Sequence, residues 1–145
     1  MDTLNQHCEK PYRLVPINGF DPVTKTRIYH TDVLFALLDK HVVCCLDTIF
    51  DPVEREALLR EMQEGGRKVV NISNYEMTQM CGNMVQVKDG KTGELCILMS
   101  QKARDGLYPE NLRELENSYR IVSSDISMIE TIGGGSARCM TIELF

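Results

Sequence analysis

A cysteine near the C-terminus is the first residue whose setting suggests chemistry. Cys139 follows the stretch Gly133-Gly134-Gly135-Ser136-Ala137-Arg138, and glycines let a backbone approach a ligand closely. A cysteine attacks as its thiolate, which forms readily where a cation or backbone N–H groups lower the pKa of a thiol. Arg138 places a positive charge next to Cys139 in the sequence. We therefore predict that Cys139 is a nucleophile, with a buried structural cysteine as the alternative.

A distant histidine is the candidate general acid and base. An imidazole has an ordinary pKa of about 6.5, so it gives and takes protons near neutral pH. Of the three histidines, only His30 lies at the start of a predicted repeat unit, a position equivalent to that of Cys139. We predict that His30 is the catalytic partner of Cys139. The alternative is a surface histidine at the end of a strand.

Two polar residues near these positions are candidates for substrate binding. Asp32 lies two residues after His30, so both side chains would face the same side of an extended segment. A solvated aspartate at a strand end is the alternative. Asn83 follows Gly82 and would line the same cleft through its amide, or would serve as a turn residue that tolerates positive φ.

The glycine stretch before Cys139 supplies two more candidates for substrate binding, Gly135 and Ser136. The hydroxyl of Ser136 would line the substrate site, or would cap the loop by a hydrogen bond. Glu130 would pair with Arg138. No cofactor and no metal ion is expected, because the six cysteines form no CxxC pair.

The elements that must position these residues repeat along the chain. Two successive units share the order strand, strand, helix, strand, read from apolar runs, turn residues and helix caps. The first unit is predicted at 33–38, 41–46, 52–64 and 68–72. The second is predicted at 84–87, 95–99, a helix that begins at Pro109, and 120–123, with a hairpin turn at 89–93. A third unit opens with a strand at 139–144.

The candidate residues occupy equivalent places in this repeat. The segments 29–32, 81–83 and 136–139 each precede the first strand of a unit. If the units pack around a pseudo-symmetry axis, these segments converge, and sites are often built where repeated units meet. The repeat therefore predicts one site at the openings of three units.

These segments resemble the amidinotransferase and arginine-deiminase superfamily, the penteins, and most closely its citrulline-utilisation hydrolase branch. The resemblance runs from about Ile28 to the C-terminus. It is carried by Ile28-Tyr29-His30-Thr31-Asp32, Cys81-Gly82-Asn83-Met84, Leu98-Met99-Ser100 and Ile129-Glu130-Thr131-Ile132-Gly133-Gly134-Gly135-Ser136-Ala137-Arg138-Cys139-Met140.

The resemblance implies an α/β fold, a propeller of five ββαβ units. This chain would form a partial α/β propeller, about half of the five-unit ring and apparently its C-terminal half. We expect a single domain of residues 1–145, with a loosely packed N-terminal segment at 1–27 and units that start near 30, 82 and 138.

The resemblance also implies the reaction. Cys139 would attack a guanidino or ureido carbon of an arginine- or citrulline-like amino acid and form a covalent thiouronium-type intermediate, with His30 as acid and base. Water or an amine would then accept the group, so hydrolysis and amidino transfer both stay open. Arginine deiminases have a guanidinium-binding carboxylate at the position of Asp32, whereas the citrulline-utilisation branch often has Asn there.

Composition and charge exclude several other classes of protein. Lys and Arg number 16 against 21 Asp and Glu, a net charge of −5, and no basic stripe predicts nucleic-acid binding. The longest apolar stretch, Val33 to Leu38, is too short to cross a bilayer, and the first residues lack the pattern of a signal peptide. We therefore expect a cytoplasmic protein with no nucleic-acid or membrane partner.

Two other function classes fit the same residues. A thiol acyl hydrolase would also use Cys139 and His30, with the glycine loop as a source of oxyanion donors. A non-catalytic or split-protein fragment would act by association, since the strand edges of a half ring favour pairing with another copy or with a missing N-terminal half.

The 145-residue chain by itself is predicted to have little or no activity. The family's enzymes use a further carboxylate from the unit before the histidine, and groups that grip the amino-acid end of the substrate; both would lie before Met1. Urea, ammonia and ornithine production from arginine and citrulline, compared between this chain and a longer form, checks the prediction. Robust turnover by the 145-residue chain would contradict it.

Overall fold

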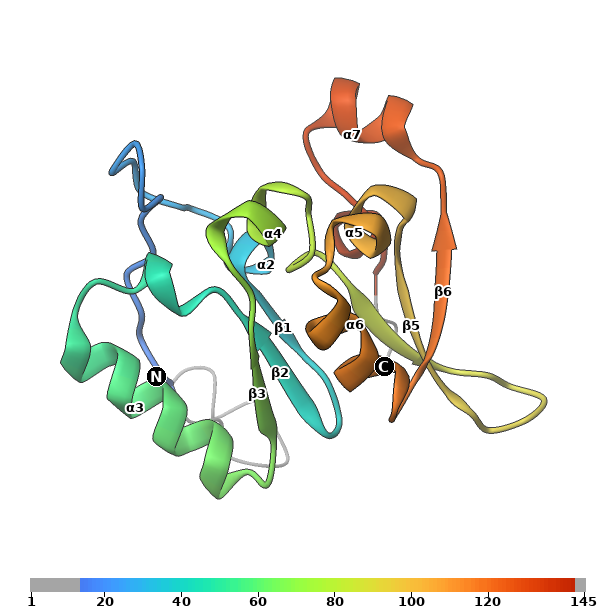
Figure 1. Cartoon of the computed structure of the whole chain (residues 1–145), viewed down its shortest axis with the longest axis horizontal. Coiled ribbons are helices and arrows are strands. Elements are labelled where there is room, and N and C mark those ends of the chain that lie inside the picture. The colour runs from blue at the N-terminus through green and yellow to red at the C-terminus, as the bar shows by residue number, and fades with distance from the viewer. Residues whose placement is uncertain (1–13, 143–145) are drawn as a thin grey trace.

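The repeated strands form two three-stranded sheets in the computed structural model, which describes residues 14–142 (Figure 1). In each sheet the middle strand pairs antiparallel with the strand before it in the sequence and parallel with the strand after it. The first sheet contains β1 (Phe35–Leu37), β2 (His41–Cys44) and β3 (Lys68–Asn71). The second contains β4 (Val85–Lys88), β5 (Leu95–Ser100) and β6 (Arg120–Ser124). The predicted repeat is therefore confirmed, whereas closure of such units into a ring stays a prediction.

The connecting helices begin where the sequence predicts. In α3 (Pro52–Glu64) the Asp51 side chain accepts a hydrogen bond from the Val53 N–H at 2.8 Å, and proline occupies the first turn. The helix ends at Gly65. In the second unit α6 (Pro109–Glu116) also begins at a proline and carries the chain back to β6. Each unit therefore crosses over between its two parallel strands through a helix.

Several short helices were not predicted. They are α4 (Asn74–Thr78), α5 (Gln101–Gly106), α7 (Ser127–Gly133) and the 3₁₀ turn η1 (Leu46–Thr48). Ser73 and Ser100 begin α4 and α5, because each hydroxyl accepts a hydrogen bond from a backbone N–H of the first turn. For α4 the bond is reciprocal, since Glu76 accepts from the Ser73 N–H and forms a capping box.

The predicted strand at 33–38 is wrong in its first two residues. Thr31–Leu34 form a single helical turn, α2, and β1 begins only at Phe35. The Val33 N–H bonds the His30 carbonyl at 3.2 Å, and Cys45 donates to the Leu34 carbonyl at 3.0 Å. These bonds turn the backbone, so the segment is not extended where Asp32 lies.

The predicted strand at 139–144 is also wrong where it is described. Arg138–Met140 form a 3₁₀ turn, η2, and residues 143 and 144 lie outside the described part of the chain. The N–H groups of Arg138 and Cys139 point at the Asn83 side-chain oxygen, at 2.9 and 3.4 Å. They are therefore not available for pairing with a strand.

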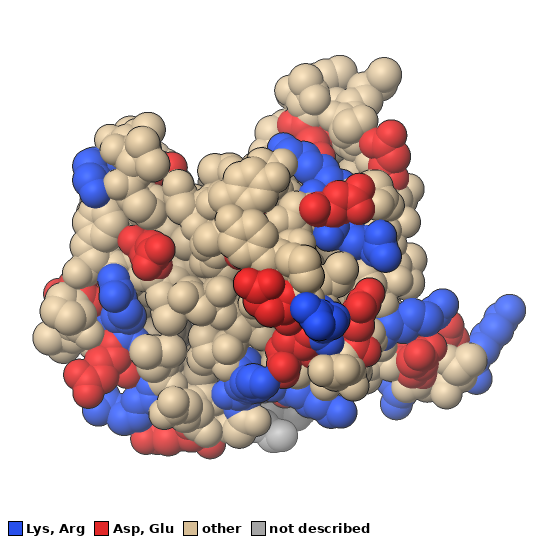
Figure 2. All heavy atoms as spheres, viewed as in Figure 1, with Lys and Arg blue, Asp and Glu red and all other residues tan. Residues whose placement is uncertain are grey.

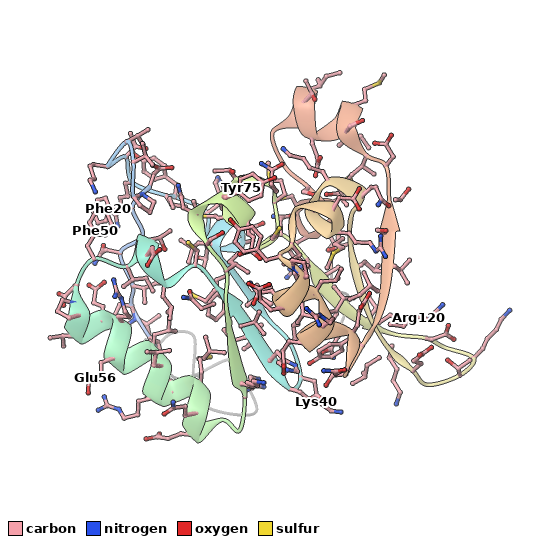
Figure 3. The ribbon with its side chains drawn as sticks, viewed as in Figure 1. Phe20, Lys40, Phe50, Glu56, Tyr75 and Arg120 are labelled. Atoms are coloured by element: carbon pink, nitrogen blue, oxygen red, sulfur yellow. The ribbon has the colours of Figure 1, made fainter. Side chains whose placement is uncertain are left out.

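Specific contacts join residues 14–27 to the first unit, although most of these residues are exposed or only partly buried. Residues 1–13 lie outside the described part, so the loose packing expected for 1–27 stays a prediction. The Asn18 amide and backbone N–H both donate to the Glu54 carboxylate, at 2.7 and 2.8 Å. Phe20 stacks on Phe50 at 5.5 Å between ring centroids (Figure 3). Gly19 is buried, and a side chain at this position would collide with Leu34.

A buried carboxylate joins the two units. Glu76 has no exposed surface. Besides its capping bonds to Ser73, it accepts from the Tyr108 N–H at 2.9 Å and the Asn111 amide at 2.8 Å, both in the second unit. Tyr75, which lies beside Glu76 in α4 and is labelled in Figure 3, stacks on Tyr108 of the second unit. Because four donors surround its carboxylate, Glu76 is buried without an unpaired oxygen.

A second polar contact lies at the other end of the interface between the units. His41 is buried in β2, and its Nε2 lies 2.9 Å from the Glu114 carboxylate of α6. The Lys68 ammonium lies 2.8 Å from the other Glu114 oxygen. Hydrogen bonds from Lys68, which has the larger effect, and from His41 hold the pKa of Glu114 below its ordinary value. The Tyr119 hydroxyl completes this contact by accepting the Lys40 N–H at 2.8 Å.

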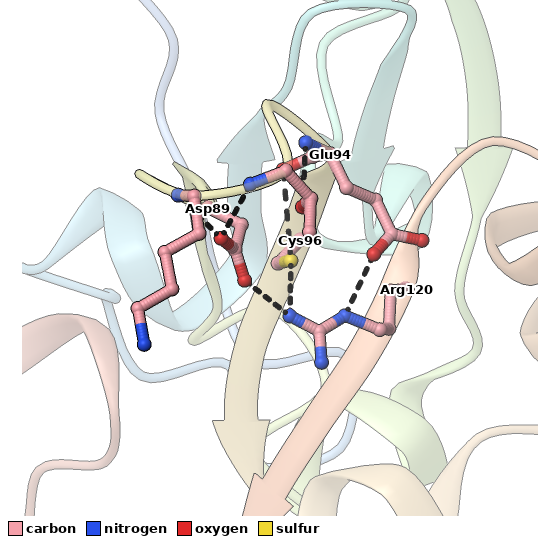
Figure 4. A network of polar contacts seen from close by, with 6 residues as sticks. Asp89, Glu94, Cys96 and Arg120 are labelled. Atoms are coloured by element: carbon pink, nitrogen blue, oxygen red, sulfur yellow. Dashed lines mark hydrogen bonds and ion pairs between the residues drawn. The ribbon is translucent and has the colours of Figure 1, made fainter.

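Arg120 fixes the β4–β5 hairpin against β6 (Figure 4). Its guanidinium donates to Asp89 and to Glu94, both at 3.0 Å, and to the sulfur of Cys96 at 3.3 Å. Asp89 also accepts the Lys91 N–H, which forms the predicted turn at 89–93. Figure 2 shows acidic and basic side chains interspersed on the visible face and on this hairpin. Within residues 14–142, no helix has the length and apolar character needed to span a bilayer.

Removal of the buried carboxylate is expected to destabilise the fold strongly. Glu76→Ala leaves donors from both units without an acceptor, and we expect a loss of about 2–4 kcal/mol in the free energy of unfolding. Urea denaturation at pH 7 measures it. Glu56→Ala on the exposed side of α3 is the matched control, with an expected change within about 0.5 kcal/mol. Equal midpoints for the two variants would contradict this role of Glu76.

Candidate active site

Three residues from separate segments meet at one point. The Cys139 sulfur lies 3.0 Å from the Asp32 carboxylate and 3.1 Å from the Asn83 amide nitrogen. The contact between Asp32 and Cys139 joins residues 107 positions apart. The predicted convergence of the segments that open the units is therefore present for these three residues.

Asn83 is the centre of this arrangement and is only 1% exposed. Its amide nitrogen donates to the Cys139 sulfur and, at 3.2 Å each, to the side chain and the carbonyl of Asp32. Its amide oxygen accepts the N–H groups of Arg138 and Cys139. One side chain therefore fixes the position of the thiol, the carboxylate and the backbone that carries the thiol.

The position of Asn83 depends on the glycine before it. A side chain at Gly82 would collide with the carbonyl oxygen of Val33 in α2. The absence of a Cβ lets the loop pack directly on the α2 backbone, and the Asn83 N–H bonds the Met80 carbonyl at 2.9 Å. Asn83 therefore reaches the carbonyl of Asp32 from the adjacent segment.

Asp32 lies in the first turn of α2, half-buried. Because residues in a helix are separated by about 100° of rotation, Asp32 and His30 do not share a face in the way an extended segment would give. The expectation of a shared face required an extended segment, and the backbone is helical from Thr31 onward, so that condition is not met. Asp32 nevertheless reaches Cys139 directly.

His30 is exposed and directly precedes α2. Within residues 14–142 no hydrogen bond joins its imidazole to Cys139 or Asp32. The structure therefore brings together Asp32, Asn83 and Cys139 by hydrogen bonds that do not include His30. Its role as acid and base stays a prediction.

The glycine stretch packs against the nucleophile candidate. Gly134 ends α7 with a φ of 72°, which favours glycine. A Cβ at Gly135 would lie 2.9 Å from the Cβ and 3.1 Å from the sulfur of Cys139. Ser136 is fully buried and its hydroxyl donates to Glu130 at 2.6 Å. Ser136 is thus buried next to the segment that carries Cys139. The Glu130 carboxylate accepts a hydrogen bond from Ser136, whereas a pair with Arg138 was expected.

Cys139 is the exposed thiol among the described cysteines. Burial raises the pKa of Cys44 and of Cys81 to about 12 and that of Cys45 to about 11. These three thiols are therefore protonated at neutral pH and shielded from reagents. Cys8 lies outside the described residues.

A cavity of about 520 Å³ adjoins the site. It runs between the first strands of the two sheets, and its walls include Asp32, Phe35, Met84, Gln86 and Arg138. The walls combine apolar side chains with one carboxylate and one guanidinium. Across residues 14–142 no three His, Cys, Asp or Glu side chains form a cluster that could hold a metal ion.

The arrangement suits attack on a cationic carbon. A carboxylate in contact with a thiol favours a positively charged group in front of the sulfur and disfavours a negatively charged one. The Cys139 thiol donates to the Asp32 carboxylate, and the Asn83 amide donates to the sulfur, a bond that would also serve the thiolate once the proton has left. Sequence reasoning missed this bond and predicted only that the amide lines the cleft.

Comparisons with known proteins agree with one another. The model of the family described as N,N-dimethylarginine dimethylhydrolase, eukaryotic, matches residues 1–145. A similar solved structure is apo ArgZ, an arginine dihydrolase from the ornithine–ammonia cycle in cyanobacteria. The TM-score is 0.61 at 17% identity, over 79% of this chain and 16% of that one, so the chain spans about a sixth of ArgZ and the likeness concerns the fold. A search of the curated proteins finds no match.

Iodoacetamide is expected to modify Cys139 in the folded protein and to spare Cys44, Cys45 and Cys81. Protonation and burial protect these three, so they should react only after unfolding in urea. Mass spectrometry of tryptic peptides in a Cys8→Ser background measures the labelling. Modification of the buried thiols at the rate of Cys139 would show that the described burial is wrong.

Proposed function

The chain belongs to the eukaryotic N,N-dimethylarginine dimethylhydrolase family, and we propose that it carries the nucleophile of a hydrolase that acts on a guanidino group. The pentein superfamily predicted from the sequence is confirmed. The narrower resemblance to the citrulline-utilisation branch is not confirmed. Hydrolysis is preferred to amidino transfer, because the names of the matched family and of ArgZ both describe hydrolases.

The contact between Asp32 and Cys139 carries this proposal. A guanidinium that donates its N–H groups to the Asp32 carboxylate would lie over a sulfur 3.0 Å from that carboxylate. A neutral ureido group would gain less from the same charge. An arginine-like substrate is therefore preferred to a citrulline-like one, and Asp32 both binds and orients it.

The proposed reaction has two steps. The Cys139 thiolate forms a C–S bond to the guanidinium carbon, a C–N bond breaks, and His30 protonates the amine that leaves. Water, deprotonated by His30, then attacks the thiouronium-type carbon, and the C–S bond breaks to return the thiolate and release a ureido product. Asn83 donates to the sulfur in both steps. Both proton transfers require the His30 imidazole to approach the bound substrate. The substrate would lie between the imidazole and the Cys139 thiol.

The rival assignment as a thiol acyl hydrolase is less well supported. Such an enzyme needs free backbone N–H groups beside the nucleophile to bind an oxyanion. Here the N–H groups of Arg138 and Cys139 donate to the Asn83 oxygen. The Asp32 carboxylate would also repel an oxyanion next to the sulfur.

Association with a second copy or with another chain stays part of the proposal. Met128 and Ile132 of α7 are exposed, and α7 stands away from the two sheets in Figure 1. Apolar side chains exposed in this way are typical of contact surfaces. A partner would also supply groups that hold the amino-acid end of a substrate.

The cationic reagent 2-chloroacetamidine tests the proposed function. It mimics a guanidinium and alkylates a thiol. The ratio of its labelling rate to that of iodoacetamide should therefore be at least ten times higher at Cys139 than for free cysteine. Asp32→Asn should reduce this preference to about that of free cysteine, because the attracting charge is lost. Mass spectrometry in the Cys8→Ser background gives both rates.

His30→Ala and Asp105→Asn complete the design. His30→Ala should leave alkylation nearly unchanged and abolish turnover of arginine-like substrates in any active assembly. Asp105→Asn removes an exposed carboxylate from α5 and serves as the control for net charge. Equal amidine preference in the wild type and in Asp32→Asn would overturn the proposal.

A further inference from the structure

A buried hydrogen bond behind Cys139 has no part in the reaction described above. Ser136 Oγ donates to Glu130 Oε1 at 2.6 Å, and the two residues are 0% and 7% exposed. Such a bond to a carboxylate is charge-assisted and stronger than one between neutral groups. It connects α7 to the segment that carries Cys139.

Glu130 holds this segment through its backbone as well. Its carbonyl accepts the Gly134 N–H at 3.0 Å, which ends α7, while its side chain holds Ser136. Gly135 therefore lies between two residues that are both bound to Glu130. Since a side chain at Gly135 would collide with the Cβ and the sulfur of Cys139, the backbone that these bonds hold lies next to the nucleophile.

Stability alone does not explain this bond. The second carboxylate oxygen, Glu130 Oε2, is buried and has no hydrogen-bond partner among the described residues. A buried carboxylate oxygen without a partner costs free energy. A merely stabilising contact would be better served by a neutral side chain, so the arrangement indicates a requirement for geometry.

We infer that Glu130 and Ser136 are positioning residues that set the conformation of the 133–139 loop and thereby hold Cys139 against Asn83 and Asp32. The inference rests on the proposed role of Cys139 as nucleophile. Without the bond, the part of the loop at Gly135 and Ser136 loses its side-chain anchor, and the Arg138 and Cys139 N–H groups are held less firmly at Asn83. The thiol then samples orientations away from the carboxylate.

Two measurements on the full chain in the Cys8→Ser background test the inference. The first is hydrogen exchange of the Arg138 and Cys139 amides by NMR. The second is the ratio of the 2-chloroacetamidine to the iodoacetamide labelling rate at Cys139. In Ser136→Ala and Glu130→Ala, exchange should rise at least tenfold and the labelling ratio should fall at least fivefold. Amides of β5 should keep their protection.

Conservative variants separate positioning from stability. Glu130→Gln keeps an acceptor for Ser136 and removes the charge of the unpaired oxygen, so it should stay within threefold of the wild type in both measurements with an equal or higher Tm. Glu130→Asp keeps the charge and shortens the reach by one methylene, so it should behave like Ser136→Ala. Thr131→Ala, which removes a bond inside α7 to the Ser127 carbonyl, is the matched control.

The outcomes are distinct. Exchange and labelling ratios within twofold of the wild type in Ser136→Ala and Glu130→Ala would overturn the inference. If these variants do not fold, the comparison of Glu130→Gln with Glu130→Asp decides, and equal behaviour of the two overturns it. If the wild type shows no preference for 2-chloroacetamidine, or if Asp32→Asn keeps that preference, the proposed function is refuted instead. Amide exchange of Arg138 and Cys139 would then decide the inference.

Discussion

The site depends on one buried amide. Asn83 presents its nitrogen to a sulfur and a carboxylate and its oxygen to two backbone N–H groups, so donor and acceptor ends are both used. No charged side chain could do this, because a carboxylate lacks donors and an ammonium lacks acceptors. Burial strengthens each bond and makes the loss of any partner costly. The geometry at Cys139 is therefore set by a neutral residue that forms no covalent bond and exchanges no proton in the reaction proposed.

The rest of the fold serves to bring Asn83 to this place. Gly82 lets its loop rest on α2, and Glu76 ties the helix before that loop to the second unit. The His41–Glu114–Lys68 contact holds the other end of the interface. Because both units must be docked for the three residues to meet, the stability of the interface and the order of the site are linked.

Sequence reasoning worked best where a signal is local. Asp51 with Pro52 predicted the start of α3, and the turn at 89–93 predicted the hairpin. Ser73 and Glu76 carry the pattern of a capping box, so α4 could have been found in the same way. Two other elements could not have been predicted from local signals: the helical turn at Thr31–Leu34 and the 3₁₀ turn at Cys139. Each is held by bonds to residues distant in the sequence. Likewise, spacing indicated that Asp32, Asn83 and Cys139 converge, but it gave no sign of which atoms meet.

The separation of the site residues along the chain has a consequence for biosynthesis. The Asp32–Cys139 contact closes a loop across 107 positions. Such long-range contacts form late in folding, because the chain loses the entropy of loop closure before the contact contributes any stabilisation. During synthesis the first unit is complete while Cys139 is still inside the ribosome. A nascent chain thus carries Asp32 and Asn83 before it has the Cys139 thiol to pair with them, and the site can form only after Cys139 has left the ribosome.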